Sequence, residues 1–255
     1  MNKLMNKVAV VTGAASGIGS AITHLFLSEG ASVFAIDRNE KRLDELKHQN
    51  ILFEKKLMTF QMDLANDDEI VGLFDAVIHH FGRLDILINN AGIMDDFQPV
   101  GELKDDVWER VMKVNLDVPF KLMRNAMQIF LQQQSGNIVN VASVGGLYGG
   151  RAGAAYTTSK FGLIGLTKNT GYMYAKSGIR CNAIAPGGVN THIGETIDFN
   201  KITPLVNDRI MSGMVLNPRM GEPEEIAAVA LFLSSDDSRF VNAAVIVADG
   251  GWTAY

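Results

Sequence analysis

Short runs rich in β-branched residues alternate with longer amphipathic patterns along the chain, and this alternation constrains the fold more than any other feature. Several runs are apolar throughout, as in strands of a parallel sheet covered on both faces. The alternation predicts right-handed βαβ units and an α/β fold with a doubly wound, seven-stranded parallel sheet. The predicted strands are KVAVVT, ASVFAID, KLMTFQMD, LDILINN, GNIVNVAS, IRCNAIAP and AAVIVADG, and the predicted helices cover residues 17–29, 67–81, 106–133, 155–176 and 222–234.

Length and composition favour one domain over residues 1–255. A chain of 255 residues with 47% hydrophobic content can bury a substantial core, and this length fits one large α/β domain. We expect a cofactor half at about residues 1–100 and a catalytic and substrate half at about residues 101–255.

Two segments depart from the regular pattern. Pro119 lies within a long helical pattern and should end, kink or interrupt that helix. Periodicity is weak from Gly187 to Pro218, and in a compact domain such a stretch is usually a functional loop. We therefore expect a substrate loop at about residues 188–217.

Charge and cysteine content exclude several classes of protein. The net charge of −5 provides no basic field for nucleic acid. The single cysteine, Cys181, cannot form an internal disulfide and is interpreted as a small buried hydrophobe. His79 and His80 are neighbours that point about 100° apart on a helix, without other metal ligands beside them, so no metal is expected.

No run reaches the roughly 18 apolar residues of a membrane span, and the N-terminus lacks a signal-peptide pattern. We therefore expect a cytoplasmic protein.

A glycine-rich turn between the first predicted strand and the first helix predicts dinucleotide binding. Gly13, Gly17 and Gly19 stand in TGAASGIG, where glycine lets the backbone approach a pyrophosphate at a helix N-terminus. Asp37 ends the second strand 24 residues after Gly13, at the distance expected for an acid that binds a ribose hydroxyl. An ordinary turn explains the glycines alone, but explains Asp37 less well.

Polar residues also follow the third and fourth predicted strands. Asp63 ends the third, and NNAG at residues 89–92 ends the fourth. Ligands of open α/β sheets bind at the carboxyl ends of the strands, so these positions should lie at the same site.

Tyr156 and Lys160 are four residues apart in AAYTTSKFG. In a helix this spacing places them on one face, where the ammonium group can lower the pKa of the phenol. Such a pair also occurs by chance on many helices and does not by itself establish catalysis.

Together these motifs resemble the short-chain dehydrogenase/reductase family across nearly the whole chain. TGAASGIG resembles the family's cofactor turn, NNAG its structural motif, YTTSK its catalytic motif and PGGVNT, at residues 186–191, its nicotinamide segment. The resemblance implies a Rossmann fold and a catalytic set of Asn115, Ser143, Tyr156 and Lys160. It implies cofactor contacts by Gly13, Ser16, Gly17, Ile18, Gly19, Asp37, Arg38, Asp63, Leu64, Asn90, Ala91, Gly92, Tyr156, Lys160, Pro186, Gly187, Val189 and Thr191.

The implied activity is hydride transfer between NAD(H) and the carbonyl or secondary alcohol of a small molecule. Tyr156 acts as general acid or base, and Lys160 and the oxidised nicotinamide both lower its pKa. Lys160 also binds the nicotinamide ribose, Ser143 holds the substrate oxygen and Asn115 anchors a water. NAD is expected over NADP because the Asp37 carboxylate repels a 2′-phosphate, although Arg38 can soften that preference.

Other functions stay open. They are an acyl-carrier-protein ketoreductase that uses NADPH, a dinucleotide-sensing protein without turnover, and an epimerase or dehydratase, which would usually need a longer chain.

The family resemblance also implies a homotetramer assembled through the helices at 106–133 and 155–176 and the C-terminal strand. The outer apolar positions expected at its interfaces are Phe120, Phe130, Leu163 and Leu166. Trp252 or Tyr255 could then touch a neighbouring active site.

Several side chains near the motifs have two interpretations. His192 follows the nicotinamide segment, but a surface position is favoured. Asp95 and Asp96 are most simply a solvated turn. The residues of the substrate loop that we expect to face the pocket are Ile193, Ile197 and Phe199.

Overall fold

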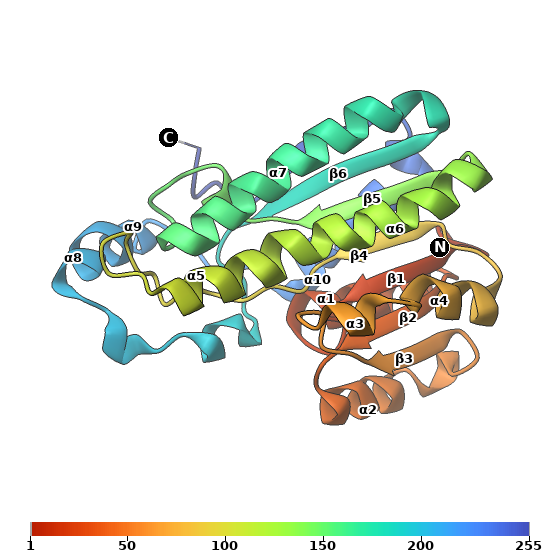
Figure 1. Ribbon diagram of the computed structural model, residues 1–255, viewed down its shortest axis with the longest axis horizontal. Helices are drawn as coiled ribbons and strands as arrows, with labels where there is room; N and C mark the ends of the chain where they lie inside the picture. The colour runs from red at the N-terminus through yellow and green to blue at the C-terminus, as the bar shows by residue number, and fades with distance from the viewer. Residues whose placement is uncertain (1, 255) are drawn as a thin grey trace.

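Seven parallel strands form one sheet in the order β3-β2-β1-β4-β5-β6-β7 (Figure 1). The computed structural model describes residues 2–254, apart from the side chains of Asp68 and Thr196. Each strand lies within one of the predicted runs, so the predicted seven-stranded, doubly wound fold is confirmed. The strands are β1 Val8–Thr12, β2 Ser32–Asp37, β3 Leu57–Gln61, β4 Ile86–Asn89, β5 Gly136–Val141, β6 Ile179–Pro186 and β7 Val245–Ala248.

The helices agree with the predicted pattern in most places. Residues 40–49 form a helix that the sequence interpretation did not include, and the predicted helix at 67–81 is divided at Gly72, whose φ of 82° is left-handed. The helices are α1 Gly17–Ser28, α2 Glu40–Gln49, α3 Asp67–Ile70, α4 Leu73–Phe81, α5 Asp105–Met112, α6 Val118–Gln133, α7 Ala154–Tyr174, α8 Pro204–Val206, α9 Ser212–Met214 and α10 Pro223–Ser234.

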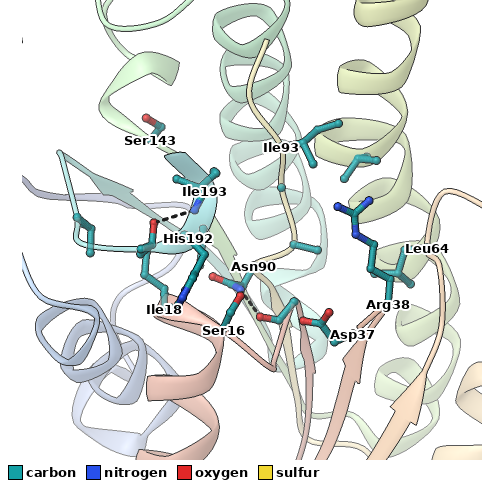
Figure 2. Close-up of a pocket in the computed structure, with 18 of the residues that line it drawn as sticks. Ser16, Ile18, Asp37, Arg38, Leu64, Asn90, Ile93, Ser143, His192 and Ile193 are labelled. Carbon is teal, nitrogen blue, oxygen red and sulfur yellow. Dashed lines mark hydrogen bonds between the residues drawn. The ribbon is translucent and has the colours of Figure 1, made fainter. Parts of the chain in front are cut away.

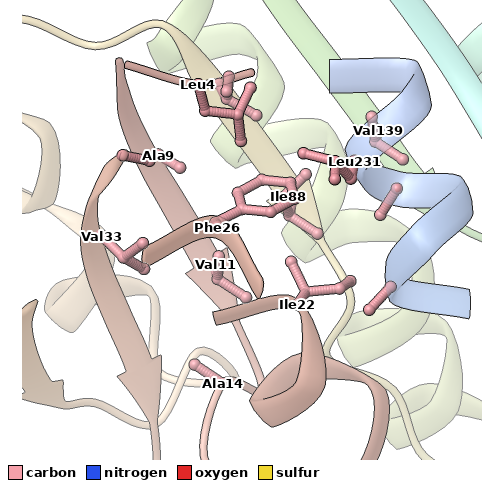
Figure 3. Packing of buried hydrophobic residues seen from close by; sticks show 14 of the residues in the cluster. Leu4, Ala9, Val11, Ala14, Ile22, Phe26, Val33, Ile88, Val139 and Leu231 are labelled. Atoms are coloured by element: carbon pink, nitrogen blue, oxygen red, sulfur yellow. The ribbon is translucent and has the colours of Figure 1, made fainter. Parts of the chain in front are cut away.

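Apolar side chains cover both faces of the sheet. On one face, Ile22 and Phe26 of α1 pack with Leu231 of α10 against the central strands (Figure 3). On the other face, Leu122 and Phe130 of α6 pack with side chains of α4. Successive side chains of a strand point to opposite faces, so the wholly apolar β1 supplies both cores.

The outcome for Cys181 follows from this packing. Its side chain is buried in β6, and burial raises the pKa of the thiol, so the prediction of a small buried hydrophobe is confirmed.

Among the helices within residues 2–254, none is both long and apolar enough to cross a membrane.

The helix around Pro119 is interrupted, as predicted. A wide π-helical turn at Lys113–Asp117 separates α5 from α6, and Pro119 lies in the first turn of α6. Proline lacks the N–H that an inner helical position would use, but the first turn does not need it. Single π-turns are frequent at functional sites, and this one contains Asn115.

Candidate functional site

A cavity of about 420 Å³ lies at the carboxyl ends of the strands. Loops that follow β1, β2, β3, β4 and β6 form one part of its wall, and the end of β5 with α7 forms the other (Figure 2). Of the predicted cofactor residues, Gly19 alone does not line this cavity. The predicted cofactor residues that line the cavity are Gly13, Ser16, Gly17, Ile18, Asp37, Arg38, Asp63, Leu64, Asn90, Ala91, Gly92, Tyr156, Lys160, Pro186, Gly187, Val189 and Thr191.

The turn between β1 and α1 depends on glycine for two different reasons. Gly13 and Gly17 have left-handed φ values of 60° and 49°, which side chains with a Cβ rarely adopt. Gly19 is in the first turn of α1, and a Cβ there would lie 2.0 Å from the Gly13 carbonyl oxygen. Gly19 therefore permits close packing behind the turn, while Gly13 and Gly17 bring the backbone to the cavity.

Asn90 holds two strand ends together beside this turn. Its Nδ2 donates to the carbonyl oxygens of Thr12, at 3.0 Å, and Gly13, at 3.1 Å. The Thr12 Oγ1 accepts in return from the Asn90 backbone N–H at 3.0 Å. This reciprocal bonding fixes the ends of β1 and β4 at the cavity.

Asp37 ends β2 with its carboxylate held by the backbone. Its two oxygens accept from the N–H groups of Ala15, at 3.1 Å, and Asn39, at 3.0 Å. Figure 2 shows the neighbouring Arg38 guanidinium turned away from this carboxylate. A negative charge is therefore held in place at the end of the cavity where the second strand terminates.

Arg42 is a pocket residue that the sequence did not reveal. It lines the cavity from α2, and its Nη2 lies 3.2 Å from Oε2 of Glu195 in the predicted substrate loop. The two residues are 153 positions apart, so no local pattern could have predicted their pairing.

The predicted catalytic residues Ser143, Tyr156 and Lys160 meet at the other part of the cavity. The Lys160 Nζ lies 5.5 Å from the centroid of the Tyr156 ring and donates to the Val141 carbonyl oxygen at 3.0 Å. The Ser143 hydroxyl also acts on the Tyr156 phenol, in the direction that lowers its pKa. Three elements distant in sequence thus bring a phenol, a hydroxyl and an ammonium group together.

Burial opposes the pKa shift that we expected for Tyr156. It raises the pKa of the phenol to about 12, while the Ser143 hydroxyl acts in the lowering direction. Burial also lowers the pKa of Lys160 to about 8. Lys160 is not a cause of the shift in this structure, where removal of the phenol from water disfavours its charged form. The combined lowering by Lys160 and the oxidised nicotinamide stays a prediction.

Asn115 lies behind the wall of the cavity and does not line it. Its Oδ1 accepts from the Ile93 N–H at 2.9 Å, and its Nδ2 donates to the Ile93 carbonyl oxygen at 2.9 Å. The Nδ2 also donates to the Ser159 Oγ at 3.2 Å. Asn115 thus joins the wide turn before α6 to the loop after β4 and to α7.

Only some of the side chains that we expected to face the pocket from the predicted substrate loop line the cavity. His192 and Ile193 line the cavity, which favours the pocket interpretation of His192, although that side chain is half-exposed. Ile197 and Phe199 are not among the lining residues, and Phe199 is 65% exposed. Lining residues that the sequence interpretation missed are Asn39, Arg42, Met62, Ala65, Ile93, Arg110, Val114, Val141 and Ala142.

The interpretation of Asp95 and Asp96 as a solvated turn is wrong. Both are buried, at 0% and 4% exposure. Their carboxylates accept hydrogen bonds from α7 and from the substrate loop. Nothing in the local sequence distinguishes them from a surface pair, because the segments that cover them lie far away in the chain.

Within the described part of the chain, no cluster of three or more His, Cys, Asp or Glu side chains could hold a metal ion.

Comparisons with known proteins place this geometry in context. A family profile described as "Enoyl-(Acyl carrier protein) reductase" matches residues 13–253. The chain is similar to 3beta-hydroxysteroid dehydrogenase 2 of Eggerthella lenta, with 45% identity over 99% of this chain and 96% of the relative. It is also similar to the 3-oxoacyl-(acyl-carrier-protein) reductase FabG of Thermotoga maritima, with 39% identity over 98% of each chain.

The chain is also similar to a solved structure over nearly its whole length. The crystal structure of levodione reductase superimposes with a TM-score of 0.89 at 32% identity, over 99% of this chain and 100% of that one.

Proposed function

Because the chain belongs to the short-chain dehydrogenase/reductase family of oxidoreductases, which transfer hydride to or from a nicotinamide dinucleotide, we propose that it prefers NAD(H) and uses Tyr156 as general acid or base. One observation carries the proposal. Ser143, Tyr156 and Lys160 line the same cavity as Asp37 and the glycine turn. A dinucleotide that extends along this cavity reaches from the acid at one end to the phenol at the other.

The residues present fit such a cofactor. Gly13 and Gly17 leave room beside the N-terminus of α1, and Ser16 makes no capping hydrogen bond there with its side chain. The pyrophosphate would lie at this helix N-terminus, which favours anions. Asp37 would accept from the adenosine ribose, and Lys160 would donate to the nicotinamide ribose. When bound, the nicotinamide supplies or accepts the hydride.

In the proposed mechanism the chain's own side chains move the proton and hold the reacting oxygen. For ketone reduction, the Tyr156 hydroxyl donates its proton to the carbonyl oxygen; for alcohol oxidation, the phenolate accepts the hydroxyl proton. The Ser143 Oγ accepts from the Gly145 N–H at 3.0 Å, which orients this hydroxyl toward the substrate oxygen. Asn115 positions the segment at Ile93 and anchors the water that links Lys160 to solvent.

The preference for NAD rests on the charge that the backbone holds at Asp37. Its carboxylate would face the 2′-phosphate of NADP and repel it. Arg42 also lines the cavity, but its positive charge is paired with the carboxylate of Glu195. We expect a higher kcat/KM with NADH than with NADPH. Asp37→Ser should raise the NADPH-to-NADH ratio of kcat/KM by about tenfold or more, which corresponds to about 1.4 kcal/mol.

The control for this variant is Asp44→Ser. Asp44 lies on α2, outside the cavity, and pairs with Lys47 on the surface. The control removes the same charge and should leave the ratio unchanged. A ratio that Asp37→Ser does not change would mean that the carboxylate does not select the cofactor.

For the substrate we propose an alicyclic secondary alcohol of the 3-hydroxysteroid kind, or its ketone. The relative that is 45% identical is named for a 3beta-hydroxysteroid, and Ile93, Val114 and Ile193 give this cavity apolar walls. Nicotinamide absorbance should report turnover of 3β-hydroxysteroids or 3-ketosteroids in preference to their 3α epimers. Turnover of a 3-oxoacyl thioester with NADPH and of no steroid would favour the acyl-carrier-protein ketoreductase.

We also propose a homotetramer built on α5, α6, α7 and β7. Phe120 is 44% exposed and Tyr172 is 81% exposed on these helices, so assembly would cover apolar surface. The expectation that Phe130 and Leu163 are outer positions is wrong, because both are buried in the core of one chain. Trp252 is buried too, and Tyr255 lies outside the described residues. Light scattering should give four times the chain mass, and a stable monomer at micromolar concentration would contradict this proposal.

A further inference from the structure

A tight turn at residues 95–98 lies between the catalytic helix and the substrate loop. The Gln98 N–H donates to the Asp95 carbonyl oxygen at 3.3 Å. The two central residues, Asp96 and Phe97, have left-handed φ values of 56° and 59°. Such values are unusual for a bulky residue such as phenylalanine and persist only where the surroundings enforce them.

The first contact of this turn is with the N-terminus of α7, the helix that carries Tyr156 and Lys160. The helix has no side-chain cap of its own, since its N-cap residue is Gly153. Instead, Asp95 Oδ2 accepts from the Tyr156 N–H at 2.8 Å, and the Gln98 carbonyl oxygen accepts from the Ala154 N–H at 2.9 Å. The turn thus satisfies two of the N–H groups that a helix start leaves without partners.

Gly153 shows how closely the two segments are fitted. A Cβ at this position would lie 2.6 Å from both carboxylate oxygens of Asp95 and 2.6 Å from the Gln98 backbone nitrogen. Only glycine allows the carboxylate to approach the helix start so closely. Because Asp95 bonds to the backbone of Tyr156, a shift of this carboxylate would move the catalytic residue itself.

The second contact of the turn is with the substrate loop. Asp96 Oδ1 accepts from the Asp198 N–H at 2.9 Å, and its Oδ2 accepts from the Lys201 Nζ at 2.7 Å. Burial acts to raise the pKa of Asp96, but these two hydrogen bonds, together with the positive charges of Lys201 and Arg110, outweigh it and hold the pKa below its usual range. Asp96 is therefore a buried anion, and the two groups that donate these hydrogen bonds both belong to the loop.

We propose that Asp95 and Asp96 are positioning residues with separate tasks, in which Asp95 places Tyr156 through the start of α7 and Asp96 holds the substrate loop through Asp198 and Lys201. This inference rests on the proposed role of Tyr156. It implies that two neighbouring acids control different kinetic constants, since one acts on the proton-transfer group and the other on the loop that encloses the substrate.

The test of Asp95 compares kcat with substrate KM. Asp95→Ala should lower kcat by about 10- to 100-fold, the scale expected when a reacting group is misplaced by about 1 Å, and should leave the NADH Kd and the substrate KM within about threefold. Asp95→Asn should restore most of the loss, because its amide oxygen can still accept from the Tyr156 N–H. Gly153→Ala keeps the carboxylate but displaces it, and should reproduce the fall in kcat.

The test of Asp96 uses Asp96→Asn, because asparagine tolerates the left-handed backbone. This variant and Lys201→Ala should each raise the substrate KM by about two- to fivefold, the effect of losing one ion pair of about 0.4–1 kcal/mol, with kcat nearly unchanged. The two changes together should be less than additive, since they remove the same pair. The control is Lys3→Ala, which removes a surface ion pair with Asp237 away from the cavity.

Hydrogen exchange separates this inference from the proposed function. The Tyr156 amide should exchange faster in Asp95→Ala and Gly153→Ala than in the wild type, whatever the substrate. Failure of the proposed function would appear as no wild-type turnover, with this difference in exchange intact. Unchanged exchange and unchanged kcat in Asp95→Ala, or the same kinetic change in the Asp95 and Asp96 variants, would overturn the inference.

Discussion

Replacing Tyr156 by phenylalanine should lower kcat by about 10²- to 10⁴-fold, the range that general acid–base catalysis contributes. The substitution removes the transferable proton but keeps the aromatic ring of a residue that is only 7% exposed. Cofactor binding should therefore change little. The measurement is kcat together with the NADH Kd from fluorescence titration. A variant that keeps more than about a tenth of the wild-type kcat would mean that another group transfers the proton.

The pH dependence provides a second measurement of the same role. Burial raises the pKa of Tyr156 to about 12, so the phenol is protonated at neutral pH, the form that ketone reduction needs. Alcohol oxidation needs the phenolate, whose fraction increases about tenfold per pH unit below the pKa. Oxidation by the wild type should thus rise from about pH 7 to about pH 10 while reduction does not. The residual oxidation by Tyr156→Phe should lose this rise.

Gly19→Ala should disrupt the cofactor turn. The new Cβ would lie 2.0 Å from the Gly13 carbonyl oxygen and 2.6 Å from the Asn90 Nδ2. Both neighbours are restrained, because that amide bonds to the carbonyl oxygens of Thr12 and Gly13. Overpacking of this kind costs about 1–3 kcal/mol or more. We expect a lower Tm and a rise of about tenfold or more in the NADH Kd.

The matched control for this substitution is Gly101→Ala. Gly101 has open space around the position of a Cβ and no left-handed φ. The control should leave the Tm and the NADH Kd unchanged. If Gly19→Ala bound NADH as tightly as the control, the close packing behind the turn would be unimportant for cofactor binding.

Much of the fold and part of the site could be predicted because the signals are local. The seven strands follow from short apolar runs, and Gly13 and Gly17 are found in a turn that directly joins a strand to a helix. Tyr156 and Lys160 lie on one helix face because four residues make about one turn. Where the prediction named lining residues from motifs, the cavity contains nearly all of them.

The environments of these residues could not be predicted in the same way. The pairing of Arg42 with Glu195 joins segments 153 residues apart. The expected lowering of the Tyr156 pKa rests on the ammonium group and on the oxidised nicotinamide, whereas burial by several distant segments raises the pKa in this structure. Phe130 and Leu163 have apolar side chains, which occur both in cores and at subunit interfaces. Their place in the core depends on which helix face meets the sheet.

By itself the sequence determined the order of strands and helices, the glycine turn and the Tyr156–Lys160 pair, because short-range backbone preferences and side-chain spacing specify them. Only the tertiary structure decided that Asp95 and Asp96 are buried between α7 and the substrate loop. Local sequence shows two adjacent acids, which are usually solvated. Their exposure depends on segments about 60 and 100 residues further along the chain, and removal from water is a property of the folded chain as a whole.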